Sequence, residues 1–208
     1  MQKRAWLILV ALSAEGALAA SGLLWISVRH LPCVAGPLAR SLGVGLLAAV
    51  ALAAVYFTLL LRGPDLPGVR SMRTLYREVF KPLFGDVGAR EVVVISLAAG
   101  FGEEMLFRGA VQQEFGWIPA SLLFGAVHVG GRQMIPFGVW AAGTGLVLGW
   151  LALWTGGLVA PITAHVVYDG LALSLIRWGP PLSPSRGGGA GTGDQPPEAT
   201  DQPSAGDR

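Results

Sequence analysis

The sequence has few of the charged residues that a soluble domain keeps on its surface. Only 13% of its 208 residues are charged, against about a quarter in ordinary soluble domains. A single cysteine, Cys33, excludes an internal disulfide, and a net charge of +2 does not favour a nucleic-acid partner. With 52% hydrophobic residues and a mean hydropathy of +0.56, the composition predicts a membrane protein.

Long apolar runs predict the membrane spans. A transmembrane helix needs about 20 mostly apolar residues. The chain has six such runs, of which the fourth is short and the third and sixth are interrupted by charged or polar side chains. The six runs are 6–28, 41–61, 92–111, 117–131, 135–154 and 158–176. The predicted fold class is therefore all-α, a polytopic membrane helix bundle with about six transmembrane helices.

The chain divides into three parts. Residues 1–89 hold two spans and a basic loop, residues 90–178 hold the other spans, and residues 179–208 are rich in Gly and Pro. Such a tail cannot bury a core, so we expect it to be disordered. The first 19 residues also resemble a signal peptide that ends at Ala17-Leu18-Ala19. Because the apolar run continues to Val28, we favour a retained span.

Basic residues are concentrated between the second and third spans. The segment 62–90 contains six Lys or Arg and three Asp or Glu. Positively charged loops stay on the cytoplasmic side, so both termini are predicted to be cytoplasmic. Arg29 and Arg40, in the loop at the other side, break this pattern. Within the basic segment, residues 72–84 fit either an amphipathic helix on the inner surface or a plain basic loop.

The stretch from Glu103 to Arg108 places three charges near the end of the third span. Charges within a span are costly and mark functional sites. Residues four apart share a helix face, so Glu104 and Arg108 are predicted to pair. Glu103 points about 100° away and remains available as a general base on water. The alternative is that all three charges form a structural ion-pair cluster.

Two of the three histidines lie in later spans. His128 is in the fourth, and His165 lies in the sixth, four residues before Asp169. Asp169 is therefore placed to accept a hydrogen bond from the imidazole and to fix its tautomer. One glutamate and two histidines suit the activation of water, and the same three side chains would also serve as zinc ligands. The His-Glu-x-x-His signature is absent, so we favour a site with no metal and no cofactor.

Three motifs, in this order on separate apolar segments, resemble the CPBP family. They are Glu103-Glu104-x-x-x-Arg108, Phe124-x-x-x-His128 and His165-x-x-x-Asp169. This family, also called Abi, contains the CAAX prenyl proteases and the bacteriocin-processing intramembrane endopeptidases. The resemblance covers about residues 90–175. It identifies residues 90–178 as a catalytic CPBP-like helix core.

The resemblance implies an intramembrane peptidase of the glutamic type. Glu103 and His128 would position and deprotonate a water molecule that attacks a peptide carbonyl. His165 and Asp169 would support the tetrahedral oxyanion. The other two charges of the first motif would be structural or would orient Glu103. A zinc-dependent peptidase is the alternative.

The resemblance also implies a setting. The substrate would be a membrane-anchored protein or peptide in the lipid bilayer, and the protein would be integral to a bacterial inner membrane. A non-catalytic membrane binding or bacteriocin-immunity protein of the same fold is one alternative. A proton relay or small transporter is another, because intramembrane Glu and His also mark such paths. Glu103 lies ~20 Å along the helix from Arg90, so we expect the site to open toward the outer half of the membrane.

Overall fold

The computed structural model describes residues 2–180 and 182, and every regular element within them is helical. Four of the helices are long and apolar enough to cross a membrane. They are α1 (Gln2–Arg29), α2 (Leu38–Arg62), α8 (Ile135–Thr155) and α9 (Val159–Trp178). The predicted disordered tail, 179–208, lies outside the described residues apart from positions 179, 180 and 182.

The two other predicted spans have a different form. α5 (Ala89–Glu104) continues through a π-helical segment, η2 (Met105–Val111), into the short α6 (Gln112–Phe115). α7 (Trp117–Val127) has 11 residues and is therefore only about 16 Å long, roughly half of a hydrocarbon core. Helices occupy all six predicted positions, but the fourth ends at Val127 rather than at residue 131.

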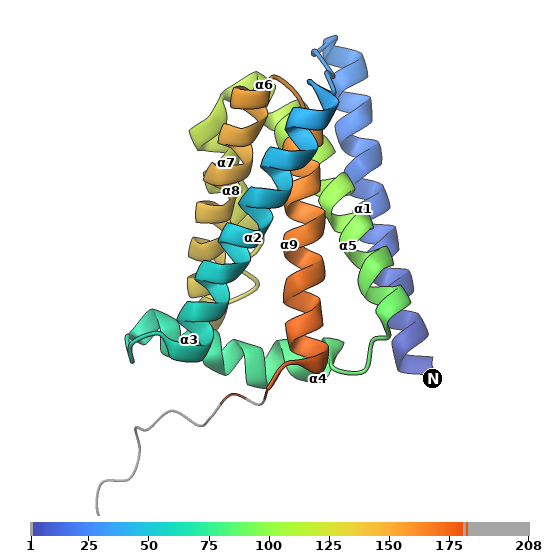
Figure 1. The fold of residues 1–208 in the computed structure, drawn as a ribbon. Coiled ribbons are helices and arrows are strands. Elements are labelled where there is room, and N and C mark those ends of the chain that lie inside the picture. Colours follow the sequence, from blue (N-terminus) through green and yellow to red (C-terminus); the bar gives the residue numbers. More distant parts are fainter. Residues whose placement is uncertain (1, 181, 183–208) are drawn as a thin grey trace, which may run out of the picture.

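α9 is the central helix of the bundle and packs against α2, α5 and α8 (Figure 1). Small residues make these contacts close, as is usual between helices in membranes. A Cβ atom on Gly100 of α5 would lie 2.5 Å from Val166 Cγ2 and 2.8 Å from the Val166 nitrogen. On α2, a Cβ on Gly45 would lie 2.6 Å from the Ala160 carbonyl oxygen. The central position of α9 brings its polar residues to the charged end of α5.

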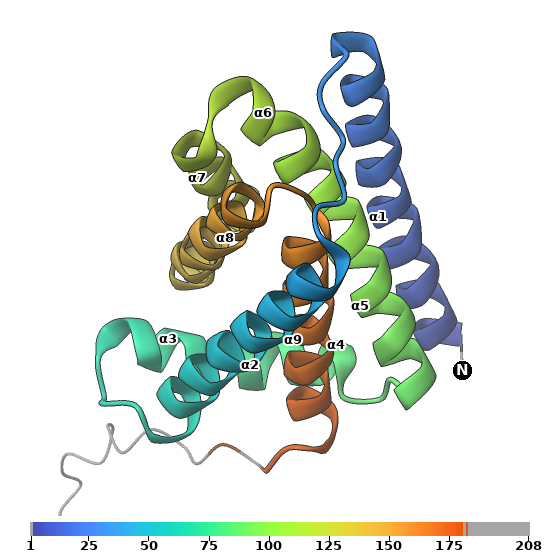
Figure 2. The same ribbon diagram turned by 45° about the horizontal axis from the view of Figure 1, so that its top comes forward.

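The basic segment forms a helical floor at the end of the bundle where α1 begins and α9 ends (Figure 1, Figure 2). The floor consists of α3 (Pro67–Leu75), η1 (Tyr76–Phe80) and α4 (Lys81–Phe84). The expectation of a helix is therefore confirmed, and the alternative of a plain loop is wrong. The predicted apolar face differs in detail, because Leu83 is 47% exposed whereas Tyr76 is buried.

Two cations of this floor cap the long helices above it. Arg73 donates hydrogen bonds to the carbonyl oxygens of Leu60 and Gly63, at 2.8 and 2.7 Å, at the end of α2. Lys81 donates to the carbonyl oxygen of Ile176 near the end of α9. Helix C-termini carry unpaired carbonyls and partial negative charge. The basic residues therefore fasten the floor to the bundle, in addition to any role in membrane orientation.

The two arginines at the opposite end are also held by specific partners. Arg29 Nε donates to Glu114 Oε1 at 2.9 Å. The Arg40 guanidinium lies 5.0 Å from the centre of the Trp154 ring. Both side chains thus have structural contacts at the end of the bundle where the charge pattern does not predict them.

Candidate active site

Glu104 is the centre of a buried ion-pair cluster. Arg108 Nη1 donates to Glu104 Oε1 at 2.7 Å, and His165 Nδ1 donates to the same oxygen at 2.8 Å. Glu104 is 0% exposed and Arg108 is 1% exposed. The predicted pair of Glu104 and Arg108 is present, and it has a third member on α9. Buried charges are tolerated when they are paired and hydrogen-bonded in this way.

Arg108 extends the cluster to α7 and α8. Its Nη2 donates to the Gly145 carbonyl oxygen at 3.0 Å, and its guanidinium lies 4.5 Å from the centre of the Phe124 ring. A Cβ atom on Gly145 would be 3.3 Å from both Arg108 Nη2 and Phe124 Cδ1. The glycine leaves room for the arginine to reach the backbone of α8. One side chain therefore connects η2, α7 and α8.

His128 lies where α7 ends. Its Nδ1 is 2.7 Å from the Phe124 carbonyl oxygen. A carbonyl oxygen can only accept, so Nδ1 carries a proton. In the neutral imidazole, Nε2 then has a free lone pair. The short helix thus presents a hydrogen-bond acceptor to the interior of the bundle.

Glu103 faces both histidines. Its Oε2 lies 3.9 Å from His128 Nε2 and 3.9 Å from His165 Nε2. These distances are too long for direct hydrogen bonds but suit a bridging water molecule. The Glu103 side chain is 13% exposed, in contrast to the fully buried Glu104. The structure therefore brings the three predicted site residues together from three helices.

Asp169 lies beside the other nitrogen of His165, with Oδ2 at 3.5 Å from Nε2. Because His165 Nδ1 donates to Glu104, it is Glu104 that fixes the orientation of this imidazole. The sequence assigned this task to Asp169, and it predicted that Glu104 and Arg108 are structural or orient Glu103. Spacing along one helix shows that Asp169 is near His165, but the contact with Glu104 depends on how α5 and α9 cross.

A cavity of about 200 Å³ adjoins these residues. Its lining includes His128, His165 and Asp169, together with Phe80 and Phe84 of the floor. The cavity therefore extends toward the basic end of the bundle, whereas the side of the membrane toward which the site opens stays a prediction. Depth along a helix gives the level of a side chain, but the direction of the free space depends on how the helices pack.

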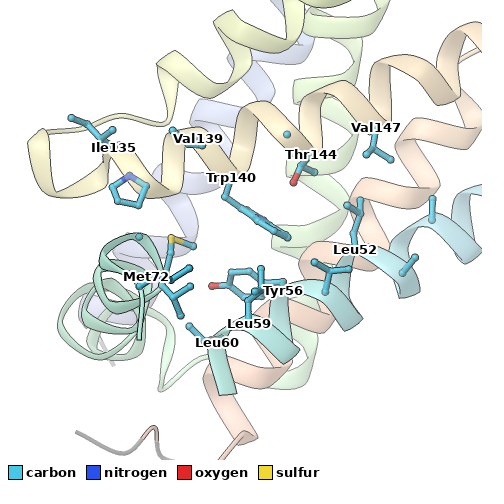
Figure 3. Close-up of a pocket in the computed structure, with 18 residues that line it drawn as sticks. Leu52, Tyr56, Leu59, Leu60, Met72, Ile135, Val139, Trp140, Thr144 and Val147 are labelled. Atoms are coloured by element: carbon cyan, nitrogen blue, oxygen red, sulfur yellow. The ribbon is translucent and has the colours of Figure 1, made fainter. Parts of the chain in front are cut away.

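A second, apolar groove of about 850 Å³ runs between α2, α3 and α8 (Figure 3). Leu52, Met72 and Val139 are among its lining residues. Three further residues, Tyr56, Trp140 and Thr144, line both the groove and the smaller cavity. Trp140 Nε1 donates to the Tyr168 hydroxyl at 2.7 Å, and the Tyr56 and Trp140 rings lie 5.3 Å apart. An aromatic wall thus separates the two spaces.

The predicted zinc alternative has a geometric requirement. Zinc ligands lie about 2.0–2.2 Å from the ion. Within residues 2–180 and 182, no group of three or more His, Cys, Asp or Glu is arranged to hold a metal ion. As arranged, the side chains do not fit the two-His, one-Glu site. Chemistry without a metal stays a proposal that chelation can test.

Glu15 on α1 is a further carboxylate near this cluster, and the motif spacing does not predict it. A Cβ atom on Gly102, the residue before Glu103, would lie 3.2 Å from Glu15 Oε2. The available signal in the sequence is a single acidic residue within the first apolar run. A charge in a span needs a partner or a function, but the sequence does not show which helix it faces.

Comparisons with known proteins agree with the motifs. Residues 88–171 match the family described as type II CAAX prenyl endopeptidase, Rce1-like. The chain is also 33% identical over 98 residues to the uncharacterized protein YpbD of Bacillus subtilis (strain 168). That alignment covers 47% of this chain and 52% of YpbD, so the chain spans about half the length of this curated relative. No solved structure matches the chain.

The matched range contains all three motifs and the helices that carry them, α5, η2, α7 and most of α9. Four apolar helices of sufficient length accompany it. The chain is an integral membrane protein, and its residues 88–171 are similar to the type II CAAX prenyl endopeptidases described as Rce1-like.

Proposed function

We propose that the protein is an intramembrane endopeptidase that hydrolyses a peptide bond of a membrane-associated protein or peptide. The observation that carries the proposal is the position of Glu103 Oε2, 3.9 Å from Nε2 of both His128 and His165. A carboxylate and an imidazole at this spacing are suited to hold one water molecule between them. The match to the Rce1-like endopeptidases supports the same reading.

The activation of water follows from the hydrogen-bond roles. Because His128 Nδ1–H is bound to the Phe124 carbonyl, His128 Nε2 is an acceptor. Glu103 Oε2 is a second acceptor. A water molecule between them donates both of its protons, and its lone pair remains free to attack. Glu103 takes one proton as the oxygen bonds to the peptide carbonyl carbon, which forms a tetrahedral oxyanion.

His165 is placed to stabilise that oxyanion. Its Nδ1–H is held by Glu104, and protonated Nε2 would be a donor directed toward Glu103 and Asp169. A positioned donor of this kind stabilises the charge that develops in the transition state. When the intermediate collapses, the C–N bond breaks and the proton on Glu103 passes to the leaving amine. The products are one new carboxyl group and one new amino group.

The apolar groove supports a substrate with a membrane-embedded part. Its lining is almost entirely hydrophobic, and it meets the catalytic cavity at Tyr56, Trp140 and Thr144. An apolar segment or lipid tail in the groove would place the adjoining polypeptide at the aromatic wall, next to the site. Binding through a remote apolar part also positions the scissile bond.

The decisive measurement is cleavage by the wild type and by Glu103→Gln in the same membrane. Purified protein is reconstituted in liposomes with peptides that carry an apolar anchor, and with the same peptides without it. Reaction in ¹⁸O-labelled water should place the label in the new carboxyl group, only with the wild type and preferentially with anchored peptides. Equal signals from the wild type and Glu103→Gln would instead favour the non-catalytic binding or immunity protein.

Metal dependence is tested on the same preparation. We expect activity to survive exhaustive chelation, because the mechanism above uses only side chains and water. Loss of activity on chelation, with recovery on zinc but not on magnesium, would contradict this. It would assign His128, His165 and a glutamate as ligands.

We further propose that the basic floor faces the cytoplasm of a bacterial inner membrane, with both termini on that side. Positively charged segments favour this orientation. The natural cysteine offers a direct test, because Cys33 is exposed in the loop between α1 and α2 at the opposite end. An impermeant thiol reagent should label it in intact cells. A cysteine at exposed Leu83, in a Cys33→Ser background, should react only after permeabilisation.

A further inference from the structure

Glu15 is a carboxylate that the proposed mechanism does not use. It lies in the middle of α1, the first apolar helix of the chain. Its Oε2 atom is buried and has no hydrogen-bond partner among the described residues. A buried carboxylate oxygen without a partner is costly. The Glu15 carboxyl group therefore needs a hydrogen-bond partner, and the apolar side chains around it cannot provide one.

The backbone of α1 approaches α5 beside Glu103. A Cβ atom on Gly102 would lie 2.5 Å from the Glu15 carbonyl oxygen and 3.2 Å from Glu15 Oε2. Figure 2 shows α1 and α5 side by side along this stretch. About two turns further along α1, a Cβ on Gly22 would lie 2.6 Å from the Met105 backbone. The glycines bring the Glu15 carboxyl group to the residue that precedes Glu103.

The charged groups around Glu103 come from four parts of the fold. Glu15 approaches from α1 beside Gly102, and His128 follows α7. The Glu104–Arg108 pair lies on its own helix, and His165 and Asp169 face it from α9. α8 contributes no titratable side chain. Because Arg108 is already bound to Glu104, the excess charge near Glu103 is negative.

We propose that Glu15 is a positioning residue of this site, whose carboxyl group shares one proton with Glu103 and orients it toward the two histidines. The hydrogen bond runs directly or through one water molecule. Two neighbouring carboxylates repel when both are charged, so such a pair retains one proton over a wide pH range. In paired carboxylates of this type, the charged member remains able to act as a base. The consequence for catalysis rests on the proposed function, but the shared proton does not.

Infrared spectroscopy tests the shared proton without any substrate. Purified, reconstituted wild type should show the carbonyl stretch of a protonated carboxyl group at neutral pH. Glu15→Gln should lose it, Glu15→Asp should retain it, and Ser13→Gln should leave it unchanged. Ser13 is exposed on the same helix, so this variant controls for an added amide in α1. An identical band in Glu15→Gln and the wild type would overturn the proposal.

The dependence of the cleavage rate on pH tests the consequence. The wild-type pair loses its shared proton at alkaline pH, so the wild-type profile should have an alkaline limb that is absent in Glu15→Gln, which has no such proton to lose. Glu15→Asp and Ser13→Gln should follow the wild type. A Glu15→Gln profile that is lower but keeps the alkaline limb would assign a purely structural role and overturn the proposal. If the wild type cleaves nothing, the proposed function fails, while the infrared result still decides the shared proton.

The inference also requires that α1 stays attached. The intact mass of the protein purified from membranes should include the segment 1–28 beyond any loss of the initiator methionine. A mature chain that begins after Ala19 would lack Glu15 and would overturn the proposal at once.

Discussion

Glu103 and Glu104 are adjacent in the chain but lie in contrasting halves of one site. Glu104 is fully buried, and Arg108 and His165 donate to one of its oxygens at 2.7 and 2.8 Å. Glu103 is partly exposed, and its histidine neighbours lie at 3.9 Å. The first half is buried, and its charges are ion-paired through Glu104 Oε1. Among the described residues, the second has no close ion pair, and a water molecule between Glu103 and the histidines is part of the proposed function.

The difference shows how the fold separates a buried ion-pair cluster, which connects the helices, from the side chains proposed for catalysis. The first half connects α5, η2, α7, α8 and α9 through a few charge-assisted bonds. His165 belongs to both halves, because its Nδ1 donates to Glu104 and its Nε2 faces Glu103. The first half therefore determines the position of a side chain in the second half. Substitutions in the two halves should therefore have different effects, and the predictions below test that.

Glu103→Gln should have the largest effect on activity. Loss of a general base typically lowers the rate by about 10²–10⁴-fold. Because the side chain makes no close ion pair, membrane abundance and melting temperature should match the wild type. Rates in liposomes and thermal unfolding in detergent measure the two quantities. An active Glu103→Gln together with an inactive, stable Glu104→Gln would transfer the role of base to Glu104.

Arg108→Ala should instead unfold the protein more easily. The change leaves Glu104 buried without its cation, which typically costs about 3–5 kcal/mol. Abundance and melting temperature should fall together with activity. The matched comparison is Arg29→Ala, which also removes an arginine–glutamate pair, but one whose arginine side chain is 60% exposed. Equal losses in the two variants would contradict the importance of the buried cluster.

Gly100→Ala should have an intermediate effect, and it should lower both stability and activity. Its new Cβ would need the space of Val166, so α9 must move away from α5, at a cost of about 1–3 kcal/mol. Gly143→Ala on α8 is the control, because nothing lies within 4 Å of its Cβ position. That control should be neutral or stabilise by about 0.5–1 kcal/mol. Both melting temperature and cleavage should fall in Gly100→Ala alone.

Asp65→Asn should have the smallest effect, at the exposed floor. Arg70 donates two hydrogen bonds to Asp65 and holds the pKa of this carboxyl below its ordinary value of 3.8. A lowered folded-state pKa gives stability that is present above the ordinary value and is lost as the pH falls through the folded value. The slight difference in melting temperature between wild type and Asp65→Asn should therefore be present at pH 7 and disappear in acid. A difference that grows in acid would exclude the pair as its source.

Local spacing predicted those features of the site that depend on one helix. Glu104 pairs with Arg108 because residues four apart share a face, and Asp169 lies beside His165 for the same reason. Spacing along one helix could not predict the contact of His165 with Glu104. It depends on the close crossing of α5 and α9 at Gly100, and glycine has no side chain that would indicate a crossing from the sequence.

The direction of the cavity and the place of Glu15 show the same limit. Helix rise gave the depth of Glu103, but the cavity beside His128 and His165 extends toward Phe80 and Phe84, which come from a separate part of the chain. Glu15 was visible as a charge in an apolar run, whereas its neighbour Gly102 is known only from the packing of α1 on α5.

By itself, the sequence determined that this is a helical membrane protein, where its helices run and which polar residues interrupt them. Hydropathy and helical spacing act over a few consecutive residues, so they can be read along the chain. The tertiary structure alone decided that Glu104 is bound by Arg108 and His165 while Glu103 faces the two histidines at 3.9 Å. Adjacent residues on a helix point about 100° apart, so which of the two is buried depends on the helices that pack on each side.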